Sequence, residues 1–393
     1  MSDVPDFKSD AEAIRDELVT WRRDFHMHPE LSFQEYRSAE VVAARLNELG
    51  YQVQTGIAKT GVVGLVKGPA PGPVVMARFD MDALPVTEEN EVDYASQNPG
   101  VMHACGHDAH MTMGLGVAKL MAQHRNEMKG TLKLIFQPAE EGLGGARHMV
   151  EEGVLENPRP DVFLSLHVFS ELPVGTIAAR PGPVMAAADE FTCTVHGKGG
   201  HGAAPHQTVD PIVASAQIIN ALQTIVSRNV GPLETAVVSV GSVHGGTALN
   251  IIPPEVKMQG SIRTFRPEIQ ELVWQRMREV VDGVSAACGA RVDLEIAAGV
   301  PAVINDSNVT EIVQAAATTV VGAENITSNH RTMGSEDASL FMQDVPGCYF
   351  FVGSANAERG LDAPHHNPRF DIDEDALPLG VATLAQSLAH YLL

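Results

Sequence analysis

The chain has 393 residues, more than one compact domain usually holds, so we expect two domains. Its hydrophobic content of 44% is that of a folded protein and excludes a disordered one. Twenty-seven basic residues stand against 49 acidic ones, which gives a net charge of -22 at pH 7. That charge repels nucleic acid and anionic membrane surfaces, and we expect neither as a partner.

The N-terminal segment is polar and acidic and lacks the apolar core of a signal peptide. No run of about 18 apolar residues occurs along the chain, so no membrane span is expected. Cysteines stand only at Cys105, Cys193, Cys288 and Cys348, too far apart for a disulfide framework. We therefore predict a location in the reducing cytoplasm.

Residues 10–50 predict two helices. Apolar side chains recur three or four residues apart from Ile14 to Phe25, and the second helix ends at Gly50. Short apolar runs follow (GVVGLV, PVVMARFD, GTLKLIFQP and DVFLSLHV), separated by helical stretches such as HMTMGLGVAKLMAQHR. Fully apolar strands alternating with helices indicate an α/β domain with a mostly parallel sheet flanked by helices.

The pattern changes near residue 184. The stretch EFTCTVHG alternates like a half-exposed strand, and a helix, two strands, a second helix and a last strand follow it. This β-α-β-β-α-β order is that of a ferredoxin-like α+β domain. We expect it to occupy residues 184–298, inserted into a first domain made of residues 1–183 and 299–393.

Polar side chains cluster after the strands of the first domain, where α/β sheets bind their ligands. The stretch HACGHDAHM places Cys105 two residues before His107. In an extended segment both side chains point the same way, and thiolate with imidazole suits zinc or another transition metal. The alternative is a buried free cysteine beside surface histidines. For His110, on the following helix, packing or an orienting contact with a ligand is expected.

Other polar residues fit the same centre. Glu140 and Glu141 stand side by side after a strand, where one can ligate a metal while the other handles protons; the alternative is an exposed pair at a helix start. His167 lies in or at the end of an apolar strand, and His365 and His366 lie in a loop. These histidines can also be ordinary core or surface residues. One cysteine, one glutamate and three histidines are too many for one tetrahedral zinc, but they fit two metals that share a bridging ligand.

The motifs of the chain, in their order, resemble those of one protein family. They are RFDMDALP, MHACGHDAHM, QPAEEG, LSLHV, GHGAAPH, ALNIIP, GSIRTF, GSEDAS and HHNPRFD, and they span nearly the whole chain. The sequence resembles the dinuclear metal-dependent amidohydrolases that include aminoacylases and glutamate carboxypeptidases. Within them, HACGHDAHM together with PAEEG resembles the branch of hippurate hydrolases, N-acyl amino acid amidohydrolases and plant auxin-conjugate hydrolases.

The resemblance implies a set of ligands for two divalent metal ions: Cys105, His107, Glu141, His167 and His366. Cys105 would bridge the two ions. Thiolate and imidazole donors favour zinc, with manganese, cobalt or nickel as alternatives. The family's HxPxFD spacing selects His366 over His365, and Asp80 would be an outer carboxylate that orients a ligand.

The resemblance also assigns catalytic and substrate-binding roles. Glu140 would be the general base, taking a proton from a metal-bound water and passing it to the leaving amine. The inserted domain would be a lid that also forms a homodimer or tetramer. Its His201 would reach the partner's active site and donate a hydrogen bond to the oxyanion, while Asn250 and Arg263 would bind the substrate carboxylate.

The predicted activity is hydrolysis of the amide bond of N-acyl amino acids, hippurate-like or N-acetylated, to a carboxylate and a free amino acid. One alternative is a dipeptidase or carboxypeptidase on the same scaffold. Others are a cysteine hydrolase with Cys105 as nucleophile and a non-catalytic metal- or ligand-binding protein. Glu140 argues against the last, because a mere metal binder needs no base beside its ligands. A zinc nucleoside deaminase is excluded, because no H-x-E with a P-C-x-x-C partner occurs.

Overall fold

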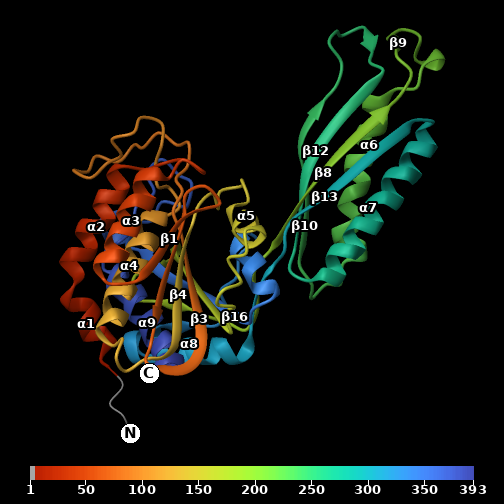
Figure 1. Cartoon of the computed structure of the whole chain (residues 1–393). Helices are drawn as coiled ribbons and strands as arrows, with labels where there is room; N and C mark the ends of the chain where they lie inside the picture. Colours follow the sequence, from red (N-terminus) through yellow and green to blue (C-terminus); the bar gives the residue numbers. More distant parts are fainter. Residues whose placement is uncertain (1–4) are drawn as a thin grey trace. The chain divides into compact units, whose positions relative to one another are not determined.

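The computed structural model describes residues 5–393, which form two compact units (Figure 1). The first unit comprises the described residues up to Gly182 with Ile304–His330 and Asp337–Leu393. The second comprises Pro183–Val303 and Arg331–Glu336. Short strands β7 (Gly182–Met185) and β14 (Val303–Asn305) lie at the chain crossings between the units.

The first unit is built on an eight-stranded sheet with the order β1-β2-β4-β3-β5-β16-β6-β15. The central strands β4, β3, β5 and β16 are parallel, while β1 and β2 pair antiparallel at one edge. The strands have these bounds: β1 Gln52–Ile57, β2 Gly61–Lys67, β3 Ala70–Asp80, β4 Lys129–Gln137, β5 Val162–Pro173, β6 Ile177–Ala178, β15 Ile326–Thr327 and β16 Gly347–Ala355.

Helices cover both faces of this sheet. On β5, Leu164 packs into the core that α4 and α9 share, and the ring of neighbouring Phe163 contacts Phe341 of the short helix η4 (Asp337–Gln343). Because successive strand residues point to opposite faces, both faces are covered, and the predicted α/β class is confirmed. The helices have these bounds: α1 Phe7–Ala13, α2 Arg15–Met27, α3 Tyr36–Glu48, α4 His107–Gln123, α5 Gly145–Glu151, α8 Ser307–Val321 and α9 Ala376–Leu392.

The second unit carries a four-stranded antiparallel sheet with the order β10-β12-β8-β13. Helices α6 (Pro211–Thr224) and α7 (Pro267–Cys288) lie side by side on one face of it (Figure 1). The elements follow one another as β8-α6-β10-β12-α7-β13, the predicted ferredoxin-like order. The strands have these bounds: β8 Ala187–His196, β10 Ala236–His244, β12 Glu255–Thr264 and β13 Arg291–Val300. A small two-stranded antiparallel sheet is formed by β9 (Gly200–His201) and β11 (Ile251–Ile252).

The second unit differs from the predicted range 184–298 in two places. Its end extends to Val303, because β13 continues pairing with β8 as far as Val300. The distant segment Arg331–Glu336 also belongs to it, because Thr332 N donates to Val184 O at 3.0 Å and Ala186 N donates to Gly334 O at 2.8 Å.

All four cysteines are free thiols. None of the helices within residues 5–393 combines the length and apolar character that a membrane crossing requires.

Candidate metal centre and active site

The predicted ligands of the first unit gather where its parallel strands end. β3 ends at Asp80, and β4 ends at Gln137, shortly before Glu140 and Glu141. His167 lies on β5, the strand between β3 and β16 in the sheet. Cys105 immediately precedes α4, which begins at His107. Because parallel strands present their carboxyl ends at one edge, residues far apart in sequence meet there.

Two groups of ligand atoms share Cys105. The ligand atoms of Cys105, His107 and His167 lie within 4.8 Å of one another, and so do those of Cys105, Glu141 and His366. Cys105 Sγ lies 3.5 Å from His167 Nε2, and His366 Nε2 lies 3.3 Å from Glu141 Oε1. The structure therefore brings all five predicted ligands together, with the single thiol common to both groups.

Unpartnered buried atoms show that these residues fit a bound cation. His107 Nδ1 donates to the backbone oxygen of Asp82 at 2.8 Å, which leaves its Nε2 buried and without a hydrogen-bond partner. Glu141 Oε1 is also buried and makes no hydrogen bond, although it lies 3.3 Å from Nε2 of His366. Unmade hydrogen bonds of buried polar atoms cost free energy, and a divalent cation between these atoms would remove that cost.

The charges of the cluster favour a cation as well. Burial and the neighbouring carboxylates of Glu141 and Glu140 raise the pKa of the Cys105 thiol well above its usual range. Burial lowers the pKa of His107, but Asp80 and Asp82 outweigh it and raise that pKa to about 10. Without a cation, both groups therefore hold a proton at neutral pH. A bound divalent ion would displace these protons and convert the two groups into ligands.

Two further histidines have both ring nitrogens engaged. His110 Nδ1 donates to Asp80 Oδ1, and its Nε2 accepts the backbone N–H of Val168 at 2.9 Å. His365 Nε2 donates to Val168 O at 3.0 Å, and its Nδ1 accepts from Ser170 Oγ at 3.1 Å. Neither ring has a nitrogen without a hydrogen bond. We therefore place His110 and His365 beside His167, the proposed ligand on β5, and not among the proposed metal ligands. These hydrogen bonds are compatible with the packing or orienting role predicted for His110.

Asp80 is fully buried beside the ligands. Its Oδ2 accepts from Arg78 Nη1 at 2.7 Å, and its Oδ1 lies 3.8 Å from His107 Nε2. With one oxygen held by Arg78 and the other by His110, the carboxylate is fixed next to a proposed ligand. That position supports the outer, orienting role.

Asp82, to which sequence reasoning assigned no role, lies beside the proposed ligands and contacts the segment of Glu140 and Glu141. Its Oδ1 accepts from Glu140 N and its Oδ2 from Glu141 N, both at 3.0 Å, and Ser32 Oγ donates to Oδ2 at 2.6 Å. Together with its contact to His107, Asp82 thus directs two proposed ligands and the proposed base. Its position two residues after Asp80 was the only available signal.

The turn before Glu140 is strained and held by hydrogen bonds. Ala139 has a φ of 53°, in the left-handed region that a non-glycine residue adopts at a cost. Glu35 Oε1 accepts Ala139 N at 2.9 Å, and Gly145 N donates to Ala139 O at 2.9 Å. These contacts fix the point at which the chain presents Glu140.

The other predicted residues lie in the second unit, where His201 and Asn250 lie together but Arg263 does not join them. His201 and Asn250 are neighbours at the β9–β11 sheet, where Gly202 N donates to Asn250 O at 2.8 Å. Arg263 lies near the far end of β12, where its Nη1 donates to Ser335 Oγ at 2.7 Å. The eight steps along β12 from Glu255 to Arg263 span roughly 26 Å. One small substrate cannot contact both ends in one chain.

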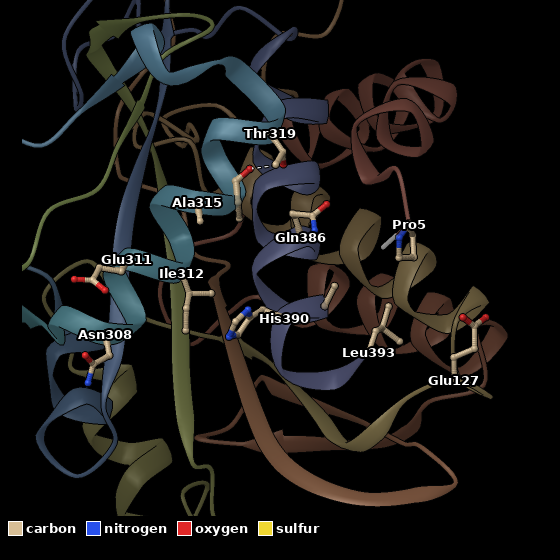
Figure 2. A pocket seen from close by; sticks show the side chains of 12 residues that line it. Pro5, Glu127, Asn308, Glu311, Ile312, Ala315, Thr319, Gln386, His390 and Leu393 are labelled. Atoms are coloured by element: carbon tan, nitrogen blue, oxygen red, sulfur yellow. Dashed lines mark hydrogen bonds between the residues drawn. The ribbon is translucent and has the colours of Figure 1, made fainter. Parts of the chain in front are cut away.

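A surface pocket of about 560 Å³ lies between α8 and α9 in the first unit (Figure 2). Ile312 and Ala315 line it from α8, and His390 and Leu393 line it from the C-terminal end. No member of the metal cluster borders it, so this pocket and the candidate metal centre are separate places.

Comparison with known proteins places this site in context. The model of "Peptidase family M20/M25/M40" matches residues 76–390. Thermostable carboxypeptidase 2 of Saccharolobus solfataricus is 42% identical over 99% of this chain and 98% of its own length. The N-acetylcysteine deacetylase of Bacillus subtilis is 39% identical over 95% of this chain and 96% of its own. The crystal structure of the Bacillus subtilis YxeP protein, a dinuclear metal-binding peptidase of the M20 family, is 35% identical, with a TM-score of 0.85, covering 96% of this chain and 98% of that one.

Proposed function

The chain belongs to peptidase family M20/M25/M40 and is a hydrolase of that family, and we propose that it hydrolyses the amide bond of N-acyl amino acids to a carboxylate and a free amino acid. One observation carries the proposal. The Glu140 carboxylate lies within 4.8 Å of ligand atoms of His107 and Glu141. A base beside proposed ligands suits hydrolysis, and the similarity to an N-acetylcysteine deacetylase supports an N-acyl amino acid as the substrate.

The proposed ligands of two divalent ions are Cys105, His107, Glu141, His167 and His366. Zinc is the proposed metal because thiolate and imidazole donors suit it, with manganese, cobalt or nickel as alternatives. When bound, such ions supply Lewis-acid polarisation of the amide carbonyl and lower the pKa of water.

Glu140 is the proposed general base and general acid. Its carboxylate accepts a proton from the attacking water and returns it to the nitrogen of the leaving amino acid. The hydrogen bond from its backbone N–H to Asp82 and the fixed turn at Ala139 hold this carboxylate beside the ligands. The base therefore requires no rearrangement of its backbone during the reaction.

The positions of His201, Asn250 and Arg263 support an active site to which two subunits contribute. His201, the proposed donor to the oxyanion, and Asn250 lie at one end of the second unit, and Arg263, the proposed binder of the substrate carboxylate, lies near the other. We propose that a homodimer or tetramer supplies the two ends to one active site from different chains. Exposed apolar side chains near the β9–β11 sheet support this contact: Leu249 is fully exposed, and Ile212, Val213 and Ile251 are about half exposed.

A carboxypeptidase or dipeptidase activity is the second candidate, favoured by the 42% identity to a thermostable carboxypeptidase. It would use the same centre and would differ in the group accepted on the acyl side. The cytoplasmic location stays a prediction, supported by four cysteines that form no disulfide.

The test is release of free amino acid from N-acetyl, N-benzoyl and longer N-acyl amino acids, beside a set of dipeptides. The protein is loaded in turn with zinc and manganese. Glu140→Ala removes the base, and Glu127→Ala, at an exposed glutamate, is the control. Release that requires metal and is lost only in Glu140→Ala supports the proposal. Release from the dipeptides alone would establish the second candidate instead.

A further inference from the structure

We propose that Arg22 is a positioning residue of the metal centre. Its guanidinium ties the segment that carries Cys105 and His107 to the segment that carries His366. The inference rests on the ligand set proposed above, but it concerns a residue of α2, which contributes no ligand to that set.

Arg22 bridges the carboxylates of Asp108 and Asp371, which lie on the two segments that carry proposed ligands. Its side chain is fully buried, its Nε donates to Asp108 Oδ2 at 2.8 Å and its Nη2 donates to Asp371 Oδ1 at 2.7 Å. Asp108 directly follows His107, and Asp371 comes five residues after His366. Because the guanidinium is rigid and planar, it fixes the distance between these carboxylates and therefore between the two segments.

The segment of His366 needs such an anchor. His366 has a φ of 66°, which a non-glycine residue adopts at a cost, and its backbone N–H donates to Ala104 O at 2.8 Å. Asp371 also accepts from Tyr94 Oη at 2.8 Å through its second oxygen. The strained loop is thus held at the ligand by the backbone hydrogen bond to Ala104 and at its other end by Arg22 and Tyr94. Between these ends, Glu89 N donates to Pro368 O at 2.9 Å and Asn90 Nδ2 donates to Phe370 O at 3.1 Å, but neither contact reaches the segment of Cys105 and His107.

The surroundings of Arg22 keep its carboxylate partners in place. His26 Nδ1 lies 2.7 Å from Asp108 Oδ2, and His26 Nε2 lies 3.1 Å from Glu88 Oε1. The ring of Tyr94 lies beside the guanidinium, 5.1 Å from its central carbon to the ring centroid. Each carboxylate that Arg22 bridges therefore has a second partner, and the guanidinium has little freedom to move.

Stability alone does not account for an arginine here. Removing charges from water offsets much of what a buried ion pair contributes, and apolar side chains often serve as well. What a guanidinium adds is a fixed separation and direction between its partners. Neighbouring Arg23 provides the contrast: it donates to Glu374 at 2.8 and 2.6 Å but to neither carboxylate behind the ligands, and its side chain is 42% exposed.

The test compares wild type with Arg22→Lys and Arg23→Lys in the full chain. Lysine keeps the positive charge, but a single ammonium cannot hold both carboxylates in the same geometry. Zinc stoichiometry and affinity are measured by competition with a chelator, and the absorption spectrum of the cobalt-loaded protein reports the ligand geometry. We expect Arg22→Lys to lower the affinity for at least one ion by about 10- to 100-fold and to alter the cobalt spectrum. Arg23→Lys should change neither.

Wild-type zinc affinity and cobalt spectrum in folded Arg22→Lys would overturn the inference, even if its melting temperature fell. If Arg22→Lys does not fold, Tyr94→Phe replaces it, because that change removes only the hydroxyl that donates to Asp371. Weaker metal binding in Tyr94→Phe would support the inference, and unchanged binding would refute it. If wild type itself binds no metal, the proposed ligand set fails and the inference fails with it; normal wild-type binding with no effect at Arg22 refutes the inference alone.

Discussion

Asp82 and Glu140 are joined by a hydrogen bond of 3.0 Å from the backbone N–H of Glu140 to Asp82 Oδ1. The second oxygen of the same carboxylate accepts the N–H of Glu141, also at 3.0 Å. The proposed base and a proposed ligand therefore share one anchor on the segment after β3. Substrate chemistry and metal binding depend on the same side chain, which contacts neither substrate nor metal in the proposed scheme.

Replacing Asp82 should weaken metal binding and lower catalytic activity. Asp82→Asn places an amide N–H₂ against one of the two backbone N–H groups, so the Glu140–Glu141 turn loses one hydrogen bond. We expect zinc affinity and kcat each to fall by about 10- to 100-fold, as for other partners that orient ligands. Chelator competition and steady-state kinetics measure these two effects.

The control for Asp82→Asn is Asp161→Asn. Asp161 Oδ2 accepts the backbone N–H of Val74 at 2.8 Å, near the opposite end of β3. It is the same kind of hydrogen bond, but far from the ligands. Equal effects of the two variants would mean that Asp82 acts on stability and has no special role at the site.

Substitutions of the adjacent residues Glu140 and Glu141 should have different effects on kcat and on metal content. Glu140→Gln should retain its metals and lose about 10²- to 10⁴-fold in kcat, because the base is lost while the shape is kept. Glu141→Gln should bind fewer ions per chain. Metal analysis beside kinetics distinguishes them, and full metal content with normal kcat in Glu140→Gln would contradict the assignment of the base.

Metal removal should inactivate and destabilise the enzyme. At a free zinc concentration 100 times its Kd, binding adds about 2.7 kcal/mol to the free energy of unfolding, which raises the melting temperature. Cys105→Ser should bind fewer than two ions and show a smaller rise, because the thiol belongs to both ligand groups. Activity that survives in metal-free protein and disappears on thiol alkylation would instead indicate a cysteine nucleophile.

Mixing inactive variants should restore activity if the active site is shared between subunits. His201→Ala and Arg263→Ala should each lose about 10²-fold or more in kcat/KM as pure proteins. A mixed dimer would contain one intact site, because each chain supplies the end that the other lacks. Activity is measured after subunit exchange, which native mass spectrometry verifies.

The chain offers a matched control for this mixing experiment. His201 and Asn250 lie together at the β9–β11 sheet, so His201→Ala mixed with Asn250→Ala leaves every site with one defect and should stay inactive. Recovery in that control, or no recovery in the first mixture despite exchange, would refute sharing of the site between subunits.

Lys133 should make stability rise with pH on the alkaline side. Its side chain is 2% exposed on β4, and burial lowers its pKa from the ordinary 10.5 to about 8. Between pH 8 and 10.5 the unfolded chain binds this proton and the folded chain does not, so the free energy of unfolding increases through that window. Urea unfolding at several pH values should show this rise in wild type and a smaller one in Lys133→Met. Equal slopes would mean that the Lys133 pKa is not lowered.

The sequence by itself determined the class of each unit and the family. Apolar runs such as DVFLSLHV predicted strands buried on both faces, and strand β5 lies at that place with both faces covered. The order of elements from EFTCTVHG onward predicted the ferredoxin-like fold of the second unit. These features are local, because the period of the apolar residues reports which faces of an element are buried.

Only the tertiary structure decided how the polar residues are used. It showed that His110 and His365 have both nitrogens engaged while Nε2 of His107 makes no hydrogen bond. It also showed that Asp82 accepts the backbone N–H groups of Glu140 and Glu141. A histidine's role depends on which of its nitrogens remains free after folding. The partners that decide this, such as Val168 for His365, stand up to about two hundred residues away in the chain. Hydrogen bonds over such separations follow no periodic pattern, so the sequence alone does not reveal them.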